Sequence, residues 1–306
     1  MGHDHQHGSG SDVWRLGLAV AIAASLFVAQ LVGAQLTGSL ALLADTAHVG
    51  ADAIGLIIGL TAAVVSRRPA SDRHTWGWLR AEVLGALVQA TLLIGVAVLV
   101  VISAVERLWQ PAEIPGTMLL WFGIIGLAGN LLAFAVLAGG RTRSLNLRAA
   151  TLEVGADALG SIAVILAAVL IQLTGWGAAD SIAAVAIGVL IVPRAVALLR
   201  ETTSVLLEAT PPGLDLEQVR QHLLGVDHVL EVHDLHASRV STGLPVLTAH
   251  VVLETRCFAD GHSVQILTQL QECVAEHFPV SVAHSTFQLE TPERQCDSAG
   301  LHAHTR

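Results

Sequence analysis

The chain contains no lysine, and only 13% of its 306 residues are charged. All sixteen of its basic side chains are therefore arginines. Cysteine is scarce as well, because Cys257, Cys273 and Cys296 are the only three and no two of them form a Cys-x-x-Cys pair. This excludes a small secreted domain held together by disulfides and a zinc finger with thiolate ligands.

Two signatures of nucleotide binding and catalysis are also missing. The sequence has no Gly-x-x-x-x-Gly-Lys-[Ser/Thr] phosphate loop and no His-Glu-x-x-His helix. An intramembrane metalloenzyme needs such a helix to supply a general base beside an open coordination position. We therefore expect a protein that is not an enzyme.

Acidic residues are concentrated in the last third of the chain. Residues 206–306 hold thirteen acidic residues against five arginines, so eight of the nine net negative charges lie there. A domain of this charge attracts cations and repels nucleic acid. We therefore exclude DNA and RNA as partners.

Apolar residues, in contrast, make up 53% of the chain. Six segments in its first two thirds are long enough to cross a bilayer. They are Trp14–Ala34, Leu40–Val65, Ala81–Val105, Met118–Leu137, Ala149–Leu173 and Trp176–Leu199. The first is too long for the apolar core of a secretory signal and is expected to be a retained helix. These segments indicate an integral membrane protein surrounded by lipid.

The arginines around these segments predict their orientation. Nearly all of those in the membrane part lie on the side of the N-terminus, and Arg107 alone lies on the other side. The bias of positive residues toward the cytoplasm places both termini there, in agreement with an even number of spans. The lack of a targeting segment and the lysine-free, alanine-rich composition favour a bacterial inner membrane.

Polar side chains interrupt two of the apolar segments at a regular spacing. His48 and Asp52 lie four residues apart in the second segment, and Glu153 and Asp157 repeat that spacing in the fifth. Side chains four residues apart project from one helix face about 6 Å from each other, so two facing pairs can surround one cation. A carboxylate at mid-membrane depth costs about 2.5–3.5 kcal/mol. The pattern predicts a tetrahedral site for a transported metal ion, with interhelical hydrogen bonds as the plainer alternative.

The last third has the pattern of a small α+β domain. Pro211-Pro212-Gly213 ends the last membrane segment, and Asp215 with Gln218 predicts a helix start, with the helix running to about Leu224. We expect strands over Val229–Val240, Val246–Glu254 and Val280–Glu290, and a second helix over His262–Phe278. This gives a histidine-rich cytoplasmic tail at 1–13, a six-helix domain at 14–205 and a cytoplasmic domain at 206–306.

Several stretches of the sequence carry a family resemblance. They are residues 38–52 (GSLALLADTAHVGAD), 73–82 (RHTWGWLRAE), 145–149 (LNLRA), 157–161 (DALGS) and 232–236 (VHDLH). In these stretches the chain resembles the cation diffusion facilitators, and in particular their bacterial zinc, cobalt and cadmium efflux members. The resemblance implies six transmembrane helices, a cytoplasmic ferredoxin-like domain that senses metal and pairs two subunits as a homodimer, and export of divalent metal in exchange for protons.

One residue departs from the pattern of that family. Its members usually have His-x-x-x-Asp on both metal-binding helices, whereas here the fifth segment has Glu153 in the histidine position. The predicted ligand set therefore changes from two nitrogens and two oxygens to one nitrogen and three oxygens. Harder oxygen ligands discriminate less sharply for Zn²⁺, so Co²⁺ and Cd²⁺ are alternative substrates.

Further candidate residues surround this site or follow from the resemblance. Asp45, one turn before His48, is interpreted as an orienting residue rather than a ligand. Asp72 and His74 lie in a loop that binds metal in related transporters, although a solvated loop with topogenic arginines is the plainer interpretation. The soluble domain has four histidines at positions that resemble the cytoplasmic metal sites of the family, where satisfied polar groups are the alternative. They are His233, His250, His284 and His262.

Histidines also gather at both ends of the chain, at His3, His5 and His7 and again at His302 and His304. Flexible imidazoles bind zinc weakly without a preformed site, so these ends are expected to collect metal, with a cloning remnant as the alternative for the first.

Two functions remain open from the sequence. Metal ligands must be deprotonated, so protons compete with the metal for them. This competition favours the hypothesis of a proton-coupled exporter. A membrane metal sensor would carry the same residues, and flux into vesicles decides between the two.

Overall fold

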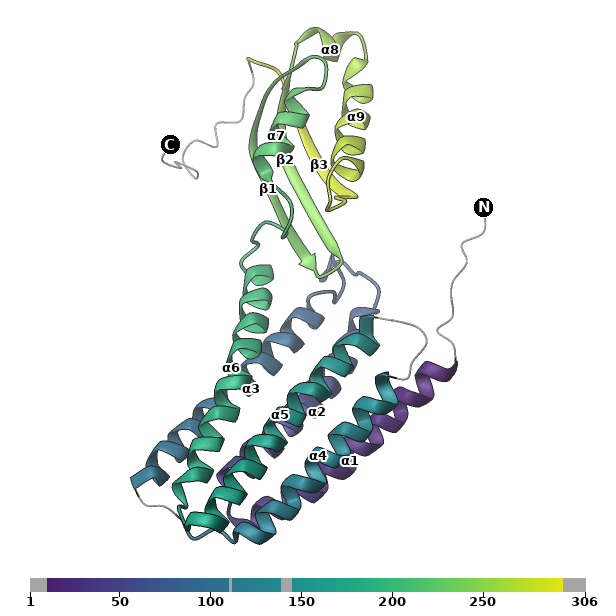
Figure 1. Cartoon of the computed structure of the whole chain (residues 1–306). Helices are drawn as coiled ribbons and strands as arrows, with labels where there is room; N and C mark the ends of the chain where they lie inside the picture. The colour runs from purple at the N-terminus through teal and green to yellow at the C-terminus, as the bar shows by residue number, and fades with distance from the viewer. Residues whose placement is uncertain (1–9, 110–111, 139–144, 294–306) are drawn as a thin grey trace. The chain divides into compact units, whose positions relative to one another are not determined.

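The structure is a computed structural model that describes residues 10–109, 112–138 and 145–293, except the side chains of 10–16, 56, 138 and 145–153. Six helices long and apolar enough to cross a membrane come first, as the sequence predicts (Figure 1). They are α1 (Gly10–Thr37), α2 (Leu40–Ser66), α3 (Ala81–Trp109), α4 (Gly116–Ala138), α5 (Leu145–Thr174) and α6 (Ala178–Leu206).

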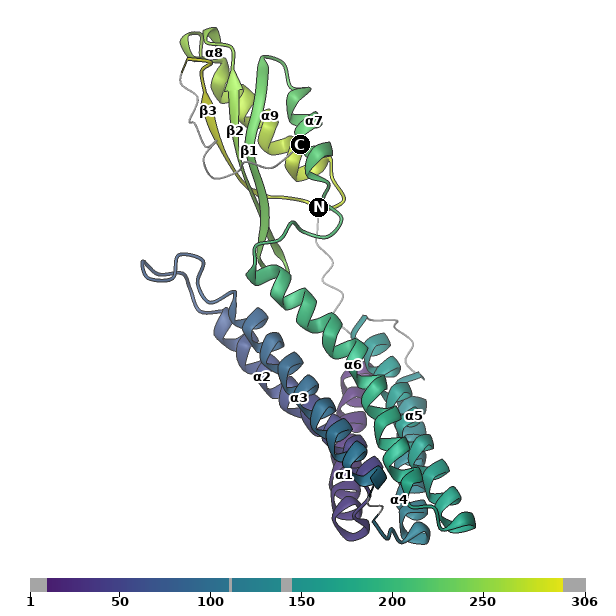
Figure 2. The same ribbon diagram turned by 90° about the vertical axis from the view of Figure 1, so that its left-hand side faces the viewer.

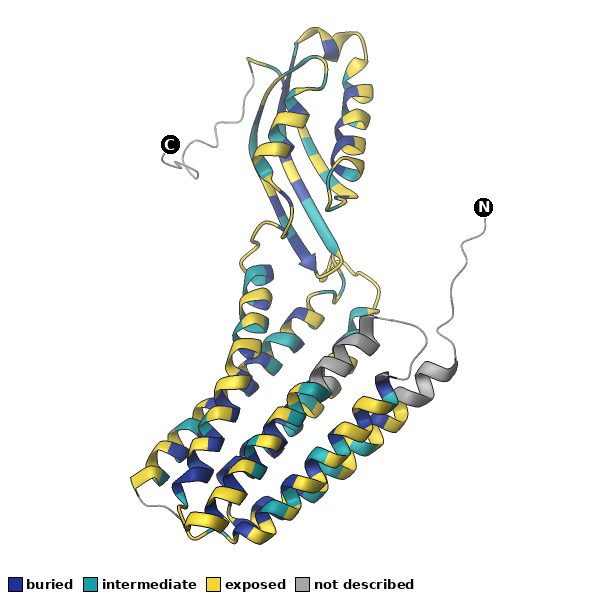
Figure 3. Ribbon diagram, in the orientation of Figure 1, coloured by how far each residue is buried: buried dark blue, intermediate teal, exposed yellow. Residues whose placement is uncertain are grey.

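Small residues let these helices approach one another. A side chain at Gly33 of α1 would lie 2.6 Å from the Phe122 ring of α4, and one at Gly123 of α4 would lie 2.8 Å from Ile165 of α5. Many buried residues of these helices are alanines, whereas many of their leucines, isoleucines and valines are exposed. Figure 3 shows buried and exposed positions alternating along the helices. Lipid is as apolar as leucine, so close packing of small residues rather than burial of large ones holds such helices together.

The C-terminal part consists of α7 (Leu216–Leu224), β1 (Val229–Ser241), β2 (Leu244–Leu253), α8 (Arg256–Ala259), α9 (His262–Glu276) and β3 (His284–Glu290). The sheet has the order β1-β2-β3, with β1 and β2 antiparallel and β2 and β3 parallel. Helices α7 and α9 contact each other and share one hydrophobic core with the sheet (Figure 2). This is the helix–strand–strand–helix–strand order that the sequence predicts.

Local sequence explains most boundaries of this domain. Asp215 Oδ1 accepts hydrogen bonds from the backbone N–H groups of Glu217 at 2.9 Å and Gln218 at 3.4 Å, which makes it the N-cap of α7 as expected. The last strand begins at His284 rather than at Val280, because the chain first turns back after α9 and Val282 donates a backbone hydrogen bond to Val274. The one-turn helix α8 was not predicted.

Candidate metal centres

The intramembrane candidate site lies between α2 and α5. His48 Nε2 is 3.6 Å from Asp52 Oδ2 on the same helix and 3.7 Å from Asp157 Oδ1 on the other. Ligand atoms of a tetrahedral zinc site with bonds of about 2.0–2.1 Å lie about 3.3 Å apart. His48 therefore lies at nearly the separation from each of two carboxylates that ligands of one small cation have.

The fourth predicted ligand, Glu153, precedes Asp157 by one helical turn on α5. Its side chain lies outside the described residues, so its role as a ligand stays a prediction. Within the described part, His48 is buried, and the side chains of Asp52 and Asp157 are 15% and 17% exposed. Most of the surface of all three side chains is therefore covered by protein.

Asp45 is held one turn away from this group of ligands. It is buried, and its Oδ2 accepts a hydrogen bond of 2.7 Å from Gln30 Nε2 of α1. Its other oxygen fills the space that Gly160 leaves on α5, where a Cβ atom would collide with it. Asp45 thus connects α1, α2 and α5 beside the site, which supports an orienting role.

A second buried carboxylate fixes the start of α2 and was not singled out from the sequence. Asp180, in the first turn of α6, accepts hydrogen bonds from the Ser39 hydroxyl and from the backbone N–H groups of Leu40 at 2.6 Å and Ala41 at 3.2 Å. These backbone donors have no partner inside their own helix. A residue 140 positions later therefore caps the helix that carries His48 and Asp52.

Arg194 of α6 also reaches the site, with its Nη1 3.8 Å from Asp52 Oδ2. Sequence analysis counted this arginine only as an indicator of orientation. The signal that it does more is its place directly after Pro193, between the apolar runs 182–192 and 195–199 of α6.

A second cluster of possible metal ligands forms on the sheet of the C-terminal domain. His233 of β1, His250 of β2 and Glu290 of β3 each offer a ligand atom, and these atoms all lie within 4.8 Å of one another. His250 Nδ1 is 2.9 Å from Glu290 Oε1, and His233 Nε2 is 3.2 Å from Glu290 Oε2. The Glu290 side chain is only 3% exposed, so this carboxylate is buried against two imidazoles.

Strand register produces this cluster. His233 and His250 are directly paired across the antiparallel strands, and His250 is paired with Gln288, two residues before Glu290, in the parallel ladder. The register of β1 shifts between His233 and His236, and Asp234 within that shift has a φ of 49°. This irregularity brings Asp234 to 3.0 Å from His236 Nε2 and 3.7 Å from His250 Nε2.

Comparison with known proteins agrees with this architecture. Residues 16–207 match the cation efflux transmembrane domain, and residues 211–292 match the cytoplasmic domain of cation efflux proteins. The chain belongs to the cation efflux family. The resemblance that the motifs indicated is thereby confirmed.

Three relatives illustrate the likeness, and each match covers nearly all of both chains. The metal cation efflux system protein CzcD of Cupriavidus metallidurans is 38% identical over 97% of this chain and 93% of its own length. The zinc transporter ZitB of Escherichia coli is 36% identical over 95% and 93%. The cadmium, cobalt and zinc/H(+)-K(+) antiporter of Bacillus subtilis is 33% identical over 98% and 96%.

Two of the candidate histidines of this cation efflux protein lie apart from the cluster on the sheet. His284 begins β3, six residues before Glu290, and its ring meets Trp76 edge-on at 4.8 Å between centroids. His262 begins α9 and its Nδ1 is 2.8 Å from Asp260 Oδ1. Hydrogen bonds from His262 lower the pKa of Asp260, so this pair keeps its carboxylate ionised. The structure does not bring either histidine to Glu290.

The remaining candidates lie in the loop after α2 and at the chain ends. Asp72 and His74 are exposed, and the His74 ring stacks on Trp78 at 4.5 Å between centroids. His3, His5, His7, His302 and His304 lie outside the described residues. Metal binding at all of these positions stays a prediction.

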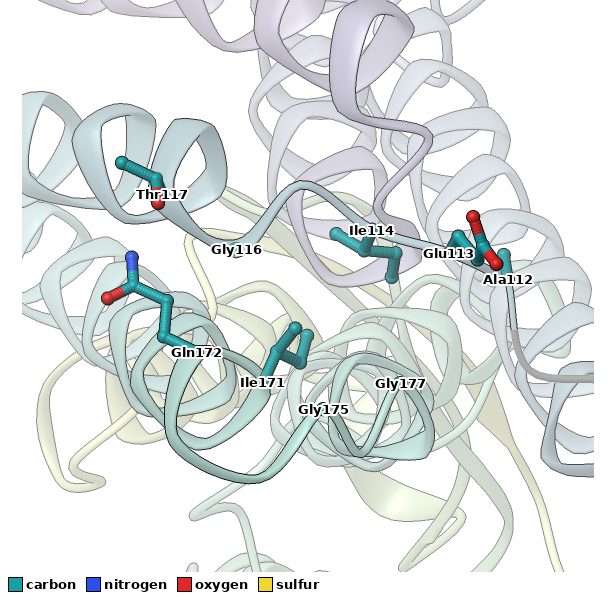
Figure 4. Close-up of a pocket in the computed structure, with 9 residues that line it drawn as sticks. All are labelled: Ala112, Glu113, Ile114, Gly116, Thr117, Ile171, Gln172, Gly175 and Gly177. Carbon is teal, nitrogen blue, oxygen red and sulfur yellow. The ribbon is translucent and has the colours of Figure 1, made fainter.

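A pocket of about 460 Å³ lies beside the α3–α4 and α5–α6 connections, and Figure 4 shows the residues that line it. Glu113, Thr117 and Gln172 supply its polar lining. Gln172 is fifteen residues beyond Asp157 on α5, which corresponds to about 22 Å along the helix. The pocket is therefore separate from the metal-ligand group.

Proposed function

We propose that this cation efflux protein is a proton-coupled antiporter that exports a divalent metal from the cytoplasm, with Zn²⁺ as the first candidate and Co²⁺ or Cd²⁺ as alternatives. The observation that carries the proposal is the approach of His48 and Asp157 to 3.7 Å across two membrane helices. The names of the relatives, which include zinc transport and cation antiport, support the same conclusion.

The chemistry of exchange follows from the proposed ligands. His48, Asp52 and Asp157, with Glu153 as the fourth, hold a metal only when they are deprotonated. Protons that arrive from the outside therefore displace the metal, and a rocking motion of the helices exposes the site to each side in turn. With one imidazole and three carboxylates, the site offers mainly oxygen, which favours a broader metal range than two imidazoles would give.

The C-terminal domain would regulate this exchange. His233, His250 and Glu290 supply three of the ligands of a zinc site, and occupancy by Zn²⁺ would report cytoplasmic metal. Residues 206–306 would form this sensing and homodimerisation domain, after the transmembrane domain at 14–205 and the tail at 1–13. We place both termini in the cytoplasm and the helices in the inner membrane of a bacterium.

Flux measurements in proteoliposomes test the proposal. Purified protein is reconstituted with an imposed pH gradient, and uptake of Zn²⁺, Co²⁺ and Cd²⁺ is followed separately. We expect metal uptake that depends on the gradient and is coupled to proton movement in the opposite direction. Saturable metal binding without flux of any of the three metals would instead identify a membrane metal sensor.

A further inference from the structure

Arg194 places a fixed positive charge beside the candidate transport site. Its Nη1 lies 3.8 Å from Asp52 Oδ2, and the same oxygen lies 3.6 Å from His48 Nε2. The guanidinium therefore stands next to a carboxylate oxygen that a bound metal would take. The Asp52 side chain is 15% exposed, so the protein covers most of it, whereas that of Arg194 is 48% exposed.

The cap at Asp180 explains why Arg194 of α6 lies near the height of Asp52 on α2. Asp180 binds the backbone of Leu40, so α2 and α6 begin at the same height. From these points, Asp52 is twelve residues along α2 and Arg194 is fourteen residues along α6, which correspond to rises of about 18 and 21 Å. Side chains lean toward the N-terminus of their helix, so the long arm of Arg194 reaches back to Asp52.

An arginine in this position differs from one that only orients a helix. A topogenic arginine extends its charged end toward the headgroups and the water. The guanidinium of Arg194 instead pairs with a carboxylate of the metal-ligand group. An arginine stays protonated at physiological pH, and in that state it has no lone pair to offer a metal.

We infer that Arg194 is a tethered counter-cation of the transport site, which pairs with Asp52 when the metal is absent and is displaced when the metal binds. This inference rests on the proposed transport function. The guanidinium neutralises part of the negative charge of the empty site. It also opposes a divalent cation at Asp52, so it lowers metal affinity and assists release. Arg194 thereby keeps a site with three carboxylates from holding its metal too tightly.

Transport kinetics test the charge of Arg194. Initial Zn²⁺ flux is measured at several metal concentrations, with metal added at pH 8 on the side of the C-terminal domain so that protons compete little. For Arg194→Gln we expect the apparent KM to fall about tenfold and the maximal rate to fall as well, because removal of a nearby charge strengthens metal binding. The KM and maximal rate of Arg194→Lys should stay close to those of the wild type. Both quantities should fall further in Arg194→Glu than in Arg194→Gln.

Arg200→Gln is the matched control, because it removes an arginine from the same helix six residues farther along. It should leave KM unchanged. An unchanged or raised KM in folded Arg194→Gln, or equal effects of Arg194→Gln and Arg194→Lys, would overturn the inference. A lack of metal flux in the wild type would instead overturn the proposed function itself.

The absence of lysine from the chain gives a second test that does not depend on the neutral variant folding. The Arg194→Lys variant carries a single side-chain amine, whose acylation by an amine-reactive reagent is located by peptide mapping. Saturating Zn²⁺ should raise its labelling rate several-fold, because metal frees the amine from Asp52. The rise should vanish when Asp157→Ala is added. A labelling rate that Zn²⁺ leaves unchanged would show that the cation at position 194 is not displaced.

Discussion

The described part of the chain holds two groups of possible metal ligands, and they are assembled in different ways. In the membrane helices, His48 and Asp52 share one helix, and His48 Nε2 lies 3.6 Å from Asp52 Oδ2 and 3.7 Å from Asp157 Oδ1 of another helix. On the sheet, His233, His250 and Glu290 come from three strands, and Glu290 lies 2.9–3.2 Å from both imidazoles. Helices can slide and tilt against each other, whereas hydrogen-bonded strands cannot. The first arrangement suits a site that opens in turn to two sides, and the second suits a site that stays formed.

Removal of one candidate ligand from each group should give the largest difference in Zn²⁺ flux between the two groups. Asp157→Ala is expected to reduce Zn²⁺ flux at least a hundredfold, because the site loses a charged ligand for which it has no substitute. Its folding should be retained, since a membrane-buried carboxylate is costly. His250→Ala should keep the maximal flux within about threefold. Flux assays on both variants in the same vesicles check this, and wild-type rates in Asp157→Ala would show that the membrane site is assigned wrongly.

The packing around Asp45 offers a way to disturb the membrane site without touching a ligand. Gly160→Ala should lower flux about tenfold, because the added methyl group collides with the Asp45 carboxylate and forces α2 away from α5. Alanine is the better helix former by about 1 kcal/mol, so helix propensity alone predicts a more stable α5 and no loss of flux.

Gly59→Ala is the control for this substitution, because nothing lies within 4 Å of a Cβ atom at that position of α2. It should transport normally. Asp45→Ala combined with Gly160→Ala removes the collision and should recover part of the flux. Normal transport by Gly160→Ala would mean that α2 and α5 tolerate a wider spacing than the structure shows.

Glu153→His sharpens the comparison by giving the membrane site a second imidazole, as the sheet site already has. The formal charge of the ligands falls from −3 to −2, and we expect preference for Zn²⁺ over Co²⁺ and Cd²⁺ to rise about threefold to tenfold. The pH dependence of transport should move toward the titration of histidine near neutrality. Flux of each metal across a pH series measures both effects, and no change in either would remove Glu153 from the ligand set.

The smallest effect on transport is expected from Glu290→Gln in the C-terminal domain. The amide keeps the shape of the side chain but removes the negative charge between His233 and His250, so Zn²⁺ affinity of the sheet site should fall about tenfold. Maximal flux at saturating metal should hardly change. Calorimetric Zn²⁺ titration of the full-length protein measures this affinity. The Asp157→Ala variant serves as the background because it lacks a proposed ligand of the membrane site, and Glu290→Gln is compared within it. Identical isotherms with and without Glu290→Gln would argue against Glu290 as a ligand.

Sequence reasoning proposed the ligand candidates on the helices because their spacing is local. His48 and Asp52 share a helix face by the 3.6-residue period, and the family motif adds the partner helix. The same reasoning proposed His284 and His262 for the soluble domain but missed Glu290, although Glu290 ended a predicted strand. Membership of a sheet cluster depends on register across three strands, and a bulge at Asp234 shifts that register in a way that residue types do not reveal.

The sequence by itself determined the six apolar spans, the α+β order of the C-terminal domain, the cap at Asp215 and the spacing of the candidate ligand pairs on two helices. Each of these depends on neighbours within a few positions of the chain. Only the tertiary structure decided that Asp45 fits against Gly160, that Asp180 caps a helix begun 140 residues earlier, and that Arg194 reaches Asp52. These contacts join segments whose relative height and rotation are set by helix packing, and packing is a property of all the helices together.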